Sequence, residues 1–185
     1  MSFKNFIAGL KLKYFSYTEL LVSTKKPKNT EPPSEMWNNI VPTILILDKL
    51  RDCLGIQIYA RSVYRAPAYN ATIENAAERS LHQAFAAVDI KIPALVNKGV
   101  SLRTVYELLK LWQDQWFESP VPVGTKQVVI EAGKIPHEDL NVRENNGVHE
   151  FQFKGHIRYY GTYIHIDTRG TNGSRDLTNA PNRSS

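Results

Sequence analysis

Cysteine is nearly absent from this sequence of 185 residues, in which Cys53 is the only one. A single thiol cannot form an intrachain disulfide, and it cannot build a cysteine-rich zinc cluster. The sequence therefore excludes disulfide scaffolds and cysteine-based zinc modules. Any metal site must rest on histidine and carboxylate side chains.

Long hydrophobic runs are also absent. The longest one, around Ile44 to Leu47, is far shorter than the roughly 20 residues that span a bilayer. The first residues lack both a continuous apolar stretch and a small-residue cleavage site, so we expect no signal peptide. The sequence predicts a soluble chain without a membrane span.

No block of basic residues stands out, although the chain has 23 Lys and Arg against 18 Asp and Glu, a net charge of +5. This balance favours contact with something anionic, which leaves nucleic acid, a membrane surface and a cell-wall polymer open. An ordinary solvated surface explains scattered charges equally well. Hydrophobic residues at 42% and charged residues at 22% are typical of a globular domain and exclude disorder as the main description.

The expected elements place helices first and strands later, which predicts an α+β domain with a small antiparallel sheet flanked by helices. We expect one domain over residues 1–170 and a flexible polar tail over 171–185. A loop is expected at 23–34 and helices at 34–54, 69–77 and 102–116, the first kinked at Pro42 and ended by Gly55. Strands are expected at 57–61, 86–92, 127–131, 148–153 and 159–168.

Two stretches carry the chemistry of interest. In the first, His82 precedes an apolar strand that Asp89 interrupts, and a buried carboxylate in such a run needs a cation, a metal or several hydrogen bonds. In the second, alternation along the strand sends Tyr163, His165 and Asp167 to one face. Each stretch therefore predicts a strand with polar side chains on one face and the hydrophobic core on the other.

Two imidazoles and one carboxylate suit a zinc ion, because they leave a fourth position open. From the residue types alone, His82, Asp89 and His165 are one choice among several, since His137, His149 and His156 are also available. Hydrogen-bonded core histidines and a salt-bridged aspartate would explain the same pattern without a metal.

The spacing of the motifs resembles that of the zinc D-Ala-D-Ala carboxypeptidase family, of the hedgehog/DD-peptidase fold type. The motifs are Ser80-x-His82-x6-Asp89, the strand Tyr163-Ile-His165-Ile-Asp167-Thr-Arg169-Gly170, and the upstream Ser62-x-Tyr64-Arg65-x-Pro67-x-Tyr69-Asn70. The resemblance spans about Phe15 to Gly170. It implies that His82, Asp89 and His165 bind one Zn²⁺.

Two positions depart from the pattern of the family. Its members usually have glycine three residues after the first histidine, where this chain has Phe85. Many members also place a glutamate or aspartate three residues before the last ligand as general base. That position is Thr162, which cannot accept a proton at neutral pH, so the usual base is missing.

Asp167 is the leading substitute for the base, with orientation of an imidazole as its alternative role. His156 is the second catalytic candidate, with simple exposure on a turn as the alternative. More distant candidates, for which a solvated acidic loop is the simpler explanation, are Glu131, His137, Glu138 and Asp139.

The function implied by the resemblance is zinc-dependent hydrolysis of peptide bonds in peptidoglycan stem peptides, by a carboxypeptidase or a cross-link endopeptidase. Arg65 is expected to hold a substrate carboxylate or the oxyanion. Ser80 and Tyr64 are expected to contact substrate, with capping and core packing as their alternatives. A salt bridge is the alternative for Arg65.

The main rival is a catalytically inactive zinc-containing domain that binds cell-wall peptide or a protein partner. A nucleic-acid-binding protein leaves Asp89 and the His-x-Asp strand unexplained, so no nucleic-acid partner is expected. We expect a monomer whose partner is a peptidoglycan peptide. Without a signal peptide, it would be cytoplasmic, or phage-associated with action at the cell wall.

Overall fold

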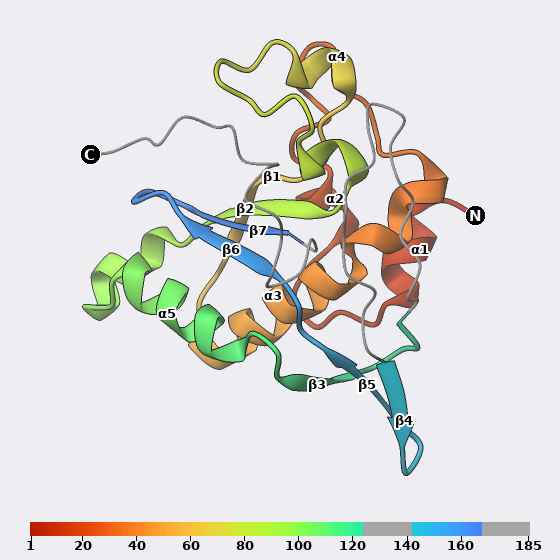
Figure 1. The fold of residues 1–185 in the computed structure, drawn as a ribbon, viewed down its shortest axis with the longest axis vertical. Helices are drawn as coiled ribbons and strands as arrows, with labels where there is room; N and C mark the ends of the chain where they lie inside the picture. Colours follow the sequence, from red (N-terminus) through yellow and green to blue (C-terminus); the bar gives the residue numbers. More distant parts are fainter. Residues whose placement is uncertain (124–141, 168–185) are drawn as a thin grey trace.

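The computed structural model describes residues 1–123 and 142–167. A four-stranded antiparallel sheet of order β1-β2-β7-β6 lies beside a three-stranded sheet of order β3-β5-β4 (Figure 1). The strands are β1 (Tyr59–Ser62), β2 (Ala87–Lys91), β3 (Trp116–Ser119), β4 (Val142–Asn145), β5 (Val148–Gln152), β6 (His156–Tyr159) and β7 (Ile164–Asp167). The α-helices are α1 (Phe3–Gly9), α2 (Tyr17–Leu20), α3 (Val41–Leu54), α4 (Pro67–Asn70) and α5 (Leu102–Trp112). Short 3-10 helices are η1 (Ser34–Ile40), η2 (Leu81–Ala84) and η3 (Pro93–Lys98), and the mixture confirms the α+β class.

The helix expected over residues 34–54 divides into two elements. Residues 34–40 form the 3-10 helix η1, and α3 begins only at Val41. Pro42 lies in the first turn of α3, where its missing N–H costs no hydrogen bond. It therefore starts the α-helix instead of kinking it. Gly55 ends α3 as predicted, with a left-handed φ of 59° and its N–H donating to the Arg51 carbonyl.

The helix expected over 102–116 ends earlier, at Trp112. Asp114 turns the chain with a φ of 62°, and its N–H donates to the Phe153 carbonyl at 2.7 Å. This long-range bond draws the chain away from the helix, so Trp116 begins β3 instead. Ser101 caps the start of α5 as predicted, because its Oγ accepts from the Thr104 N–H.

Of the strand expected over 159–168, only Tyr159 and Ile164–Asp167 are strand among the described residues, because residues 160–163 connect β6 to β7. β6 ends at Tyr159, a turn with Gly161 at a φ of 74° follows, and β7 begins at Ile164. Strands β1, β2 and β5 lie within two residues of their predicted ranges. The short helix is α4 and covers 67–70 instead of 69–77. The strand predicted at 127–131 lies outside the described residues, and α1, α2, η2, η3, β3, β4 and β6 were not predicted.

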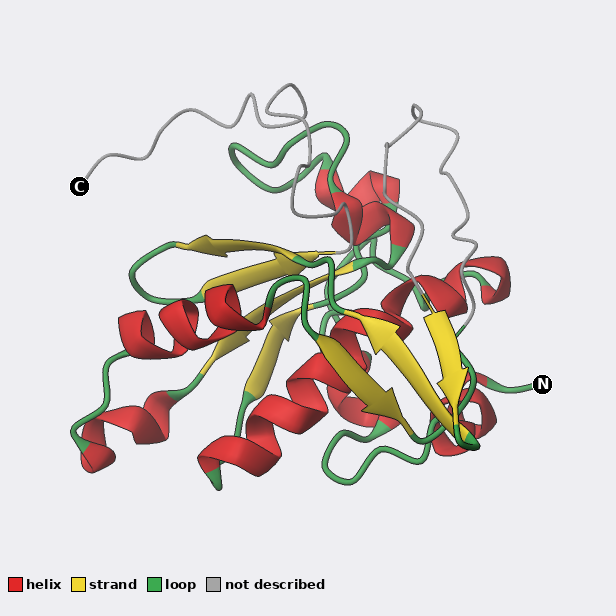
Figure 2. Cartoon of the chain, turned by 60° about the horizontal axis from the view of Figure 1, so that its bottom comes forward, coloured by secondary structure: helices red, strands yellow, loops and turns green. Residues whose placement is uncertain are grey.

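The four-stranded sheet has one apolar face and one polar face. Ile90, Ile164 and Ile166 are fully buried, and Figure 2 shows α3 and α5 on one side of this sheet and α4 on the other. The pairing of β2 with β7 sets Asp89 directly opposite His165, and β1 sets Ser62 opposite Asp89. The alternation of side chains therefore gathers these polar groups on the face that bears α4. No helix within residues 1–123 and 142–167 is long and apolar enough to cross a membrane.

Candidate metal centre

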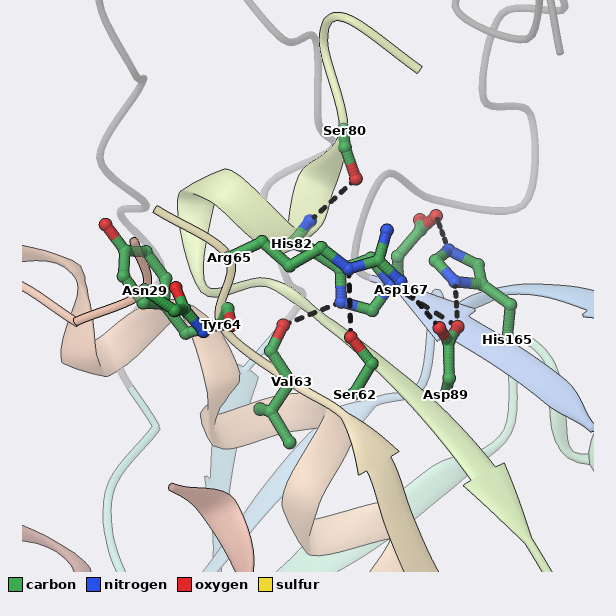
Figure 3. Close-up of polar contacts among 10 residues, drawn as sticks. All are labelled: Asn29, Ser62, Val63, Tyr64, Arg65, Ser80, His82, Asp89, His165 and Asp167. Atoms are coloured by element: carbon green, nitrogen blue, oxygen red, sulfur yellow. Dashed lines mark hydrogen bonds and ion pairs between the residues drawn. The ribbon is translucent and has the colours of Figure 1, made fainter. Parts of the chain in front are cut away.

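Three side chains from separate parts of the chain converge on the polar face. Asp89 and His165 are a cross-strand pair of β2 and β7, and His82 comes from η2. One ligand atom from each of the three lies within 4.8 Å of the other two. Figure 3 shows the three side chains directed toward one another. The structure thus brings together the three residues that the resemblance implied as metal ligands.

His82 presents an unbonded nitrogen to this cluster. Its Nδ1 lies 2.6 Å from the Val63 carbonyl oxygen, which only accepts, so Nδ1 carries the proton. Its Nε2 is buried without a hydrogen bond and lies 3.3 Å from Asp89 Oδ1. Burial lowers the pKa of His82. The imidazole is therefore neutral, and the lone pair of Nε2 points toward the carboxylate.

His165 lies between two carboxylates. Its Nδ1 is 2.8 Å from Asp89 Oδ1, and its Nε2 is 2.9 Å from Asp167 Oδ2. Burial would lower the pKa of His165, but the hydrogen bonds with Asp167 and Asp89 raise it to about 9. Without a metal, both nitrogens donate. A metal on the Asp89 side would replace the proton of Nδ1 and leave the bond to Asp167 in place.

Asp89 is buried and remains ionised. Burial alone would raise its pKa, but the hydrogen bond and the positive charge of His165 hold it well below its usual range. Its second oxygen, Oδ2, accepts from Arg65 Nη2 at 2.9 Å. The carboxylate thus has one oxygen on the guanidinium and the other between the two histidines.

The donor set fits a zinc ion. Two imidazoles and one carboxylate with an open fourth position are a ligand set of catalytic zinc sites. The 3.3 Å between His82 Nε2 and Asp89 Oδ1 is close to the roughly 3.4 Å that tetrahedral geometry sets between two zinc ligands, whereas the 2.8 Å between His165 Nδ1 and Asp89 Oδ1 is a hydrogen bond that a metal ion would replace. The unbonded Nε2 of His82 is the independent observation, because a buried polar atom without a partner is costly. A bound metal ion would remove that cost.

The loop after β1 fixes Arg65 beside the cluster. Arg65 Nε donates to Ser62 Oγ at 2.9 Å, and its backbone N–H donates to the His82 carbonyl. The Asn29 amide accepts from the Ala66 N–H at 2.7 Å and donates to the Tyr64 carbonyl at 3.1 Å. Asn29 therefore holds the loop, a role that its position in a predicted loop did not reveal.

Two residues predicted to bind substrate, Tyr64 and Ser80, make contacts within the protein instead. Tyr64 is buried and directed away from the three ligands (Figure 3), with its ring 6.2 Å from that of Phe85. Ser80 is the N-cap of η2, and its Oγ accepts from the His82 N–H at 3.4 Å. The contacts of both residues favour their alternative roles, packing and capping.

Phe85 occupies the usual glycine position with a left-handed backbone. It is the C-cap of η2, with a φ of 54° and a ψ of 37°. Its side chain is fully buried, with its ring 5.7 Å from that of Phe3. The left-handed backbone explains why glycine suits this position. Here, burial of an aromatic side chain offsets the strain.

Two of the candidates for the general base, Asp167 and His156, are cross-strand neighbours. Asp167 is fully buried and bonds His165 Nε2, which favours its positioning role. His156 lies directly across from Asp167 in the register of β6 and β7. Thr162 is exposed on the turn between these strands. Glu131, His137, Glu138 and Asp139 lie outside the described residues.

Fold and cluster together define a small α+β protein with a candidate mononuclear metal centre. The family model for Peptidase M15 matches residues 13–110, more than half of the chain. The chain belongs to the Peptidase M15 family, which confirms the resemblance seen in the sequence. The match includes His82 and Asp89, whereas His165 lies beyond it. No curated protein and no solved structure matches the chain significantly.

Proposed function

We propose that this protein is a zinc-dependent peptidase that hydrolyses peptide bonds in peptidoglycan stem peptides. Membership of the Peptidase M15 family implies a peptidase. The proposal that the peptidase uses zinc rests on one observation: His82, Asp89 and His165 converge, and Nε2 of His82 is buried without a hydrogen bond. A zinc ion bound there would polarise the scissile carbonyl and lower the pKa of a water molecule.

The residues around the ligands would orient both the site and the substrate. Asp167 holds the His165 ring through Nε2, which fixes the direction of Nδ1. Arg65 uses two of its N–H groups on Ser62 and Asp89. A guanidinium has five such groups, so Arg65 retains donors for a substrate carbonyl or carboxylate. Its side chain, 15% exposed, lies at the edge of the cluster.

A second candidate function is an inactive zinc-containing domain that binds cell-wall peptide or a protein partner. The observation that favours it is Thr162 at the usual position of the base, exposed on the β6–β7 turn. The contacts of Asp167 also favour support of His165 over proton transfer. If the protein is instead an active peptidase, His156 remains the candidate base among the residues that the structure describes.

Metal content and product analysis would separate these two functions. We expect about one zinc per chain, and we expect mass spectrometry of digested peptidoglycan to show cleaved stem peptides or released D-Ala. His165→Ala should lose both zinc and cleavage. The matched control is His149→Ala, because His149 lies in β5, in the three-stranded sheet. Zinc without cleavage of any wall preparation would support the inactive domain, and absence of zinc would contradict both functions.

A further inference from the structure

Arg61 is an exposed cation without an acidic partner at the edge of the metal centre. No carboxylate in residues 1–123 and 142–167 lies within ion-pair distance of it. Its guanidinium carbon lies 4.9 Å from the centre of the Tyr163 ring. Arg65, four residues later, is bonded to Asp89. Two neighbouring arginines therefore differ, since only Arg65 is already paired.

Arg61 lies in a bulge of β1, which gives it a different position from its neighbours Ala60 and Ser62. Ala60 pairs with Ile90 and Ser62 pairs with Asp89, so Arg61 is an extra residue without a partner on β2. Such bulges redirect a side chain and are frequent beside active sites. The bulge aligns Ser62 with Asp89 and leaves Arg61 free to reach across the sheet to Tyr163.

Tyr163 connects Arg61 with the metal ligands. It lies two residues before His165, and the alternation of the strand places both on the same face. Its ring stacks on that of Tyr160, with 4.7 Å between the ring centres and 8° between the planes. The Tyr163 ring, which this stacking on Tyr160 holds in place, lies under the Arg61 guanidinium. A guanidinium over a ring keeps its N–H groups available for a ligand.

We propose that Arg61 is a specificity-determining residue that binds a carboxylate of an acidic peptide beside the scissile bond. This inference rests on the proposed function. A carboxylate is the ligand that a fork of guanidinium N–H groups matches best in a peptide. A substrate on the polar face would extend from the metal ligands over Tyr163 and meet Arg61 next. A neutral peptide would leave that charge unpaired.

The test compares one stem pentapeptide with analogues in which its carboxylates are amidated one at a time. We expect one analogue to be cleaved about tenfold less efficiently than the free acid, through KM rather than kcat. Arg61→Gln should lose the same factor on the free acid and show no further loss on that analogue. Arg61→Lys should recover part of the preference, because it keeps the charge without the fork.

The matched control is Arg103→Gln. Arg103 is also an exposed arginine over tyrosine rings, those of Tyr106 and Tyr159, but it lies on α5 and, unlike Arg61, is paired with Glu107. Its loss removes the same charge far from the ligands and should leave KM unchanged. Equal effects of the two variants, or a wild type that cleaves acid and amide alike, would overturn the role of Arg61.

Failure of the proposed function would be seen separately, as absence of cleavage in the wild type. Binding of the same peptides to the zinc-loaded protein by calorimetry then tests Arg61. Tighter binding of the free acid by the wild type, lost in Arg61→Gln and kept in Arg103→Gln, would support the carboxylate site. Equal affinities for acid and amide would overturn it.

Discussion

Asp167 is the residue whose role the geometry defines most sharply. It is fully buried, and its Oδ2 lies 2.9 Å from His165 Nε2. Carboxylates that hold a metal-binding histidine in this way typically change metal affinity when they are replaced. A general base, in contrast, changes turnover without loss of metal. The two roles can therefore be separated by one substitution.

For Asp167→Asn we expect zinc affinity to fall about 10-fold to 100-fold, with turnover largely recovered in excess zinc. The amide still accepts a hydrogen bond from His165 but loses the negative charge. Competition with a chromogenic chelator measures the affinity, and circular dichroism checks the fold. Full zinc occupancy with abolished turnover would instead identify Asp167 as the general base.

Phe85 tests how burial balances backbone strain. Removal of a buried phenylalanine side chain costs about 3–5 kcal/mol, whereas relief of a left-handed residue returns about 1–2 kcal/mol. We therefore expect Phe85→Gly to lower the free energy of unfolding by about 1–4 kcal/mol in urea titrations. Lys11→Gly is the control, because Lys11 is exposed and has a φ of 53°. It should be neutral or stabilising, and a stabilising Phe85→Gly would show that strain dominates.

At the scale of elements, α3 illustrates how a helix end is specified. It ends at Gly55 with a φ of 59°, and an added methyl group there would meet no atom within 4 Å. The only cost of Gly55→Ala is thus the left-handed conformation, about 1 kcal/mol. Gly9→Ala is the control at the end of α1, which also has open space but no positive φ. Thermal unfolding should show a lower Tm for Gly55→Ala only; equal effects would contradict the conformational explanation.

The sequence predicted those elements whose signals are local. Gly55 and Ser101 mark helix ends through their own backbone and side-chain preferences. The predicted end of α5 was wrong because the helix is stopped by the hydrogen bond from the Asp114 N–H to the Phe153 carbonyl, which joins distant segments. The β6–β7 hairpin was missed because a short turn between apolar, β-branched residues still looks like one strand.

For the whole molecule, the metal centre is expected to add stability. Its three ligands come from η2, β2 and β7, so a bound ion would join segments that the unfolded chain cannot hold together. At a zinc concentration 100 times the Kd, the gain is about 2.7 kcal/mol, which corresponds to a rise in Tm of roughly 5–10 °C for this size. Differential scanning calorimetry with zinc and with EDTA measures it.

Variants of the ligands provide the control for this prediction. His82→Ala should abolish the response of Tm to zinc, whereas His149→Ala should keep it. His82→Ala also removes the bond to the Val63 carbonyl, so its Tm without metal is expected to fall as well. A zinc response retained in His82→Ala would place the metal elsewhere.

The sequence by itself determined the chemistry of this protein and little of its geometry. The spacing of His82 and Asp89 and the alternation around His165 are local patterns; they indicated the family, which the family model confirms, and a candidate ligand set whose three residues the fold brings together. Only the tertiary structure decided which partner each atom has. The register of β2 with β7 aligns Asp89 with His165, the fold places Asp167 behind that imidazole, and a bulge frees Arg61. The contact of Asp89 with His165 joins residues far apart in the chain, and the bulge at Arg61 depends on how β1 pairs with β2, so no short-range pattern predicts either. The contact of His165 with Asp167 is local, and only its role at the imidazole needed the structure.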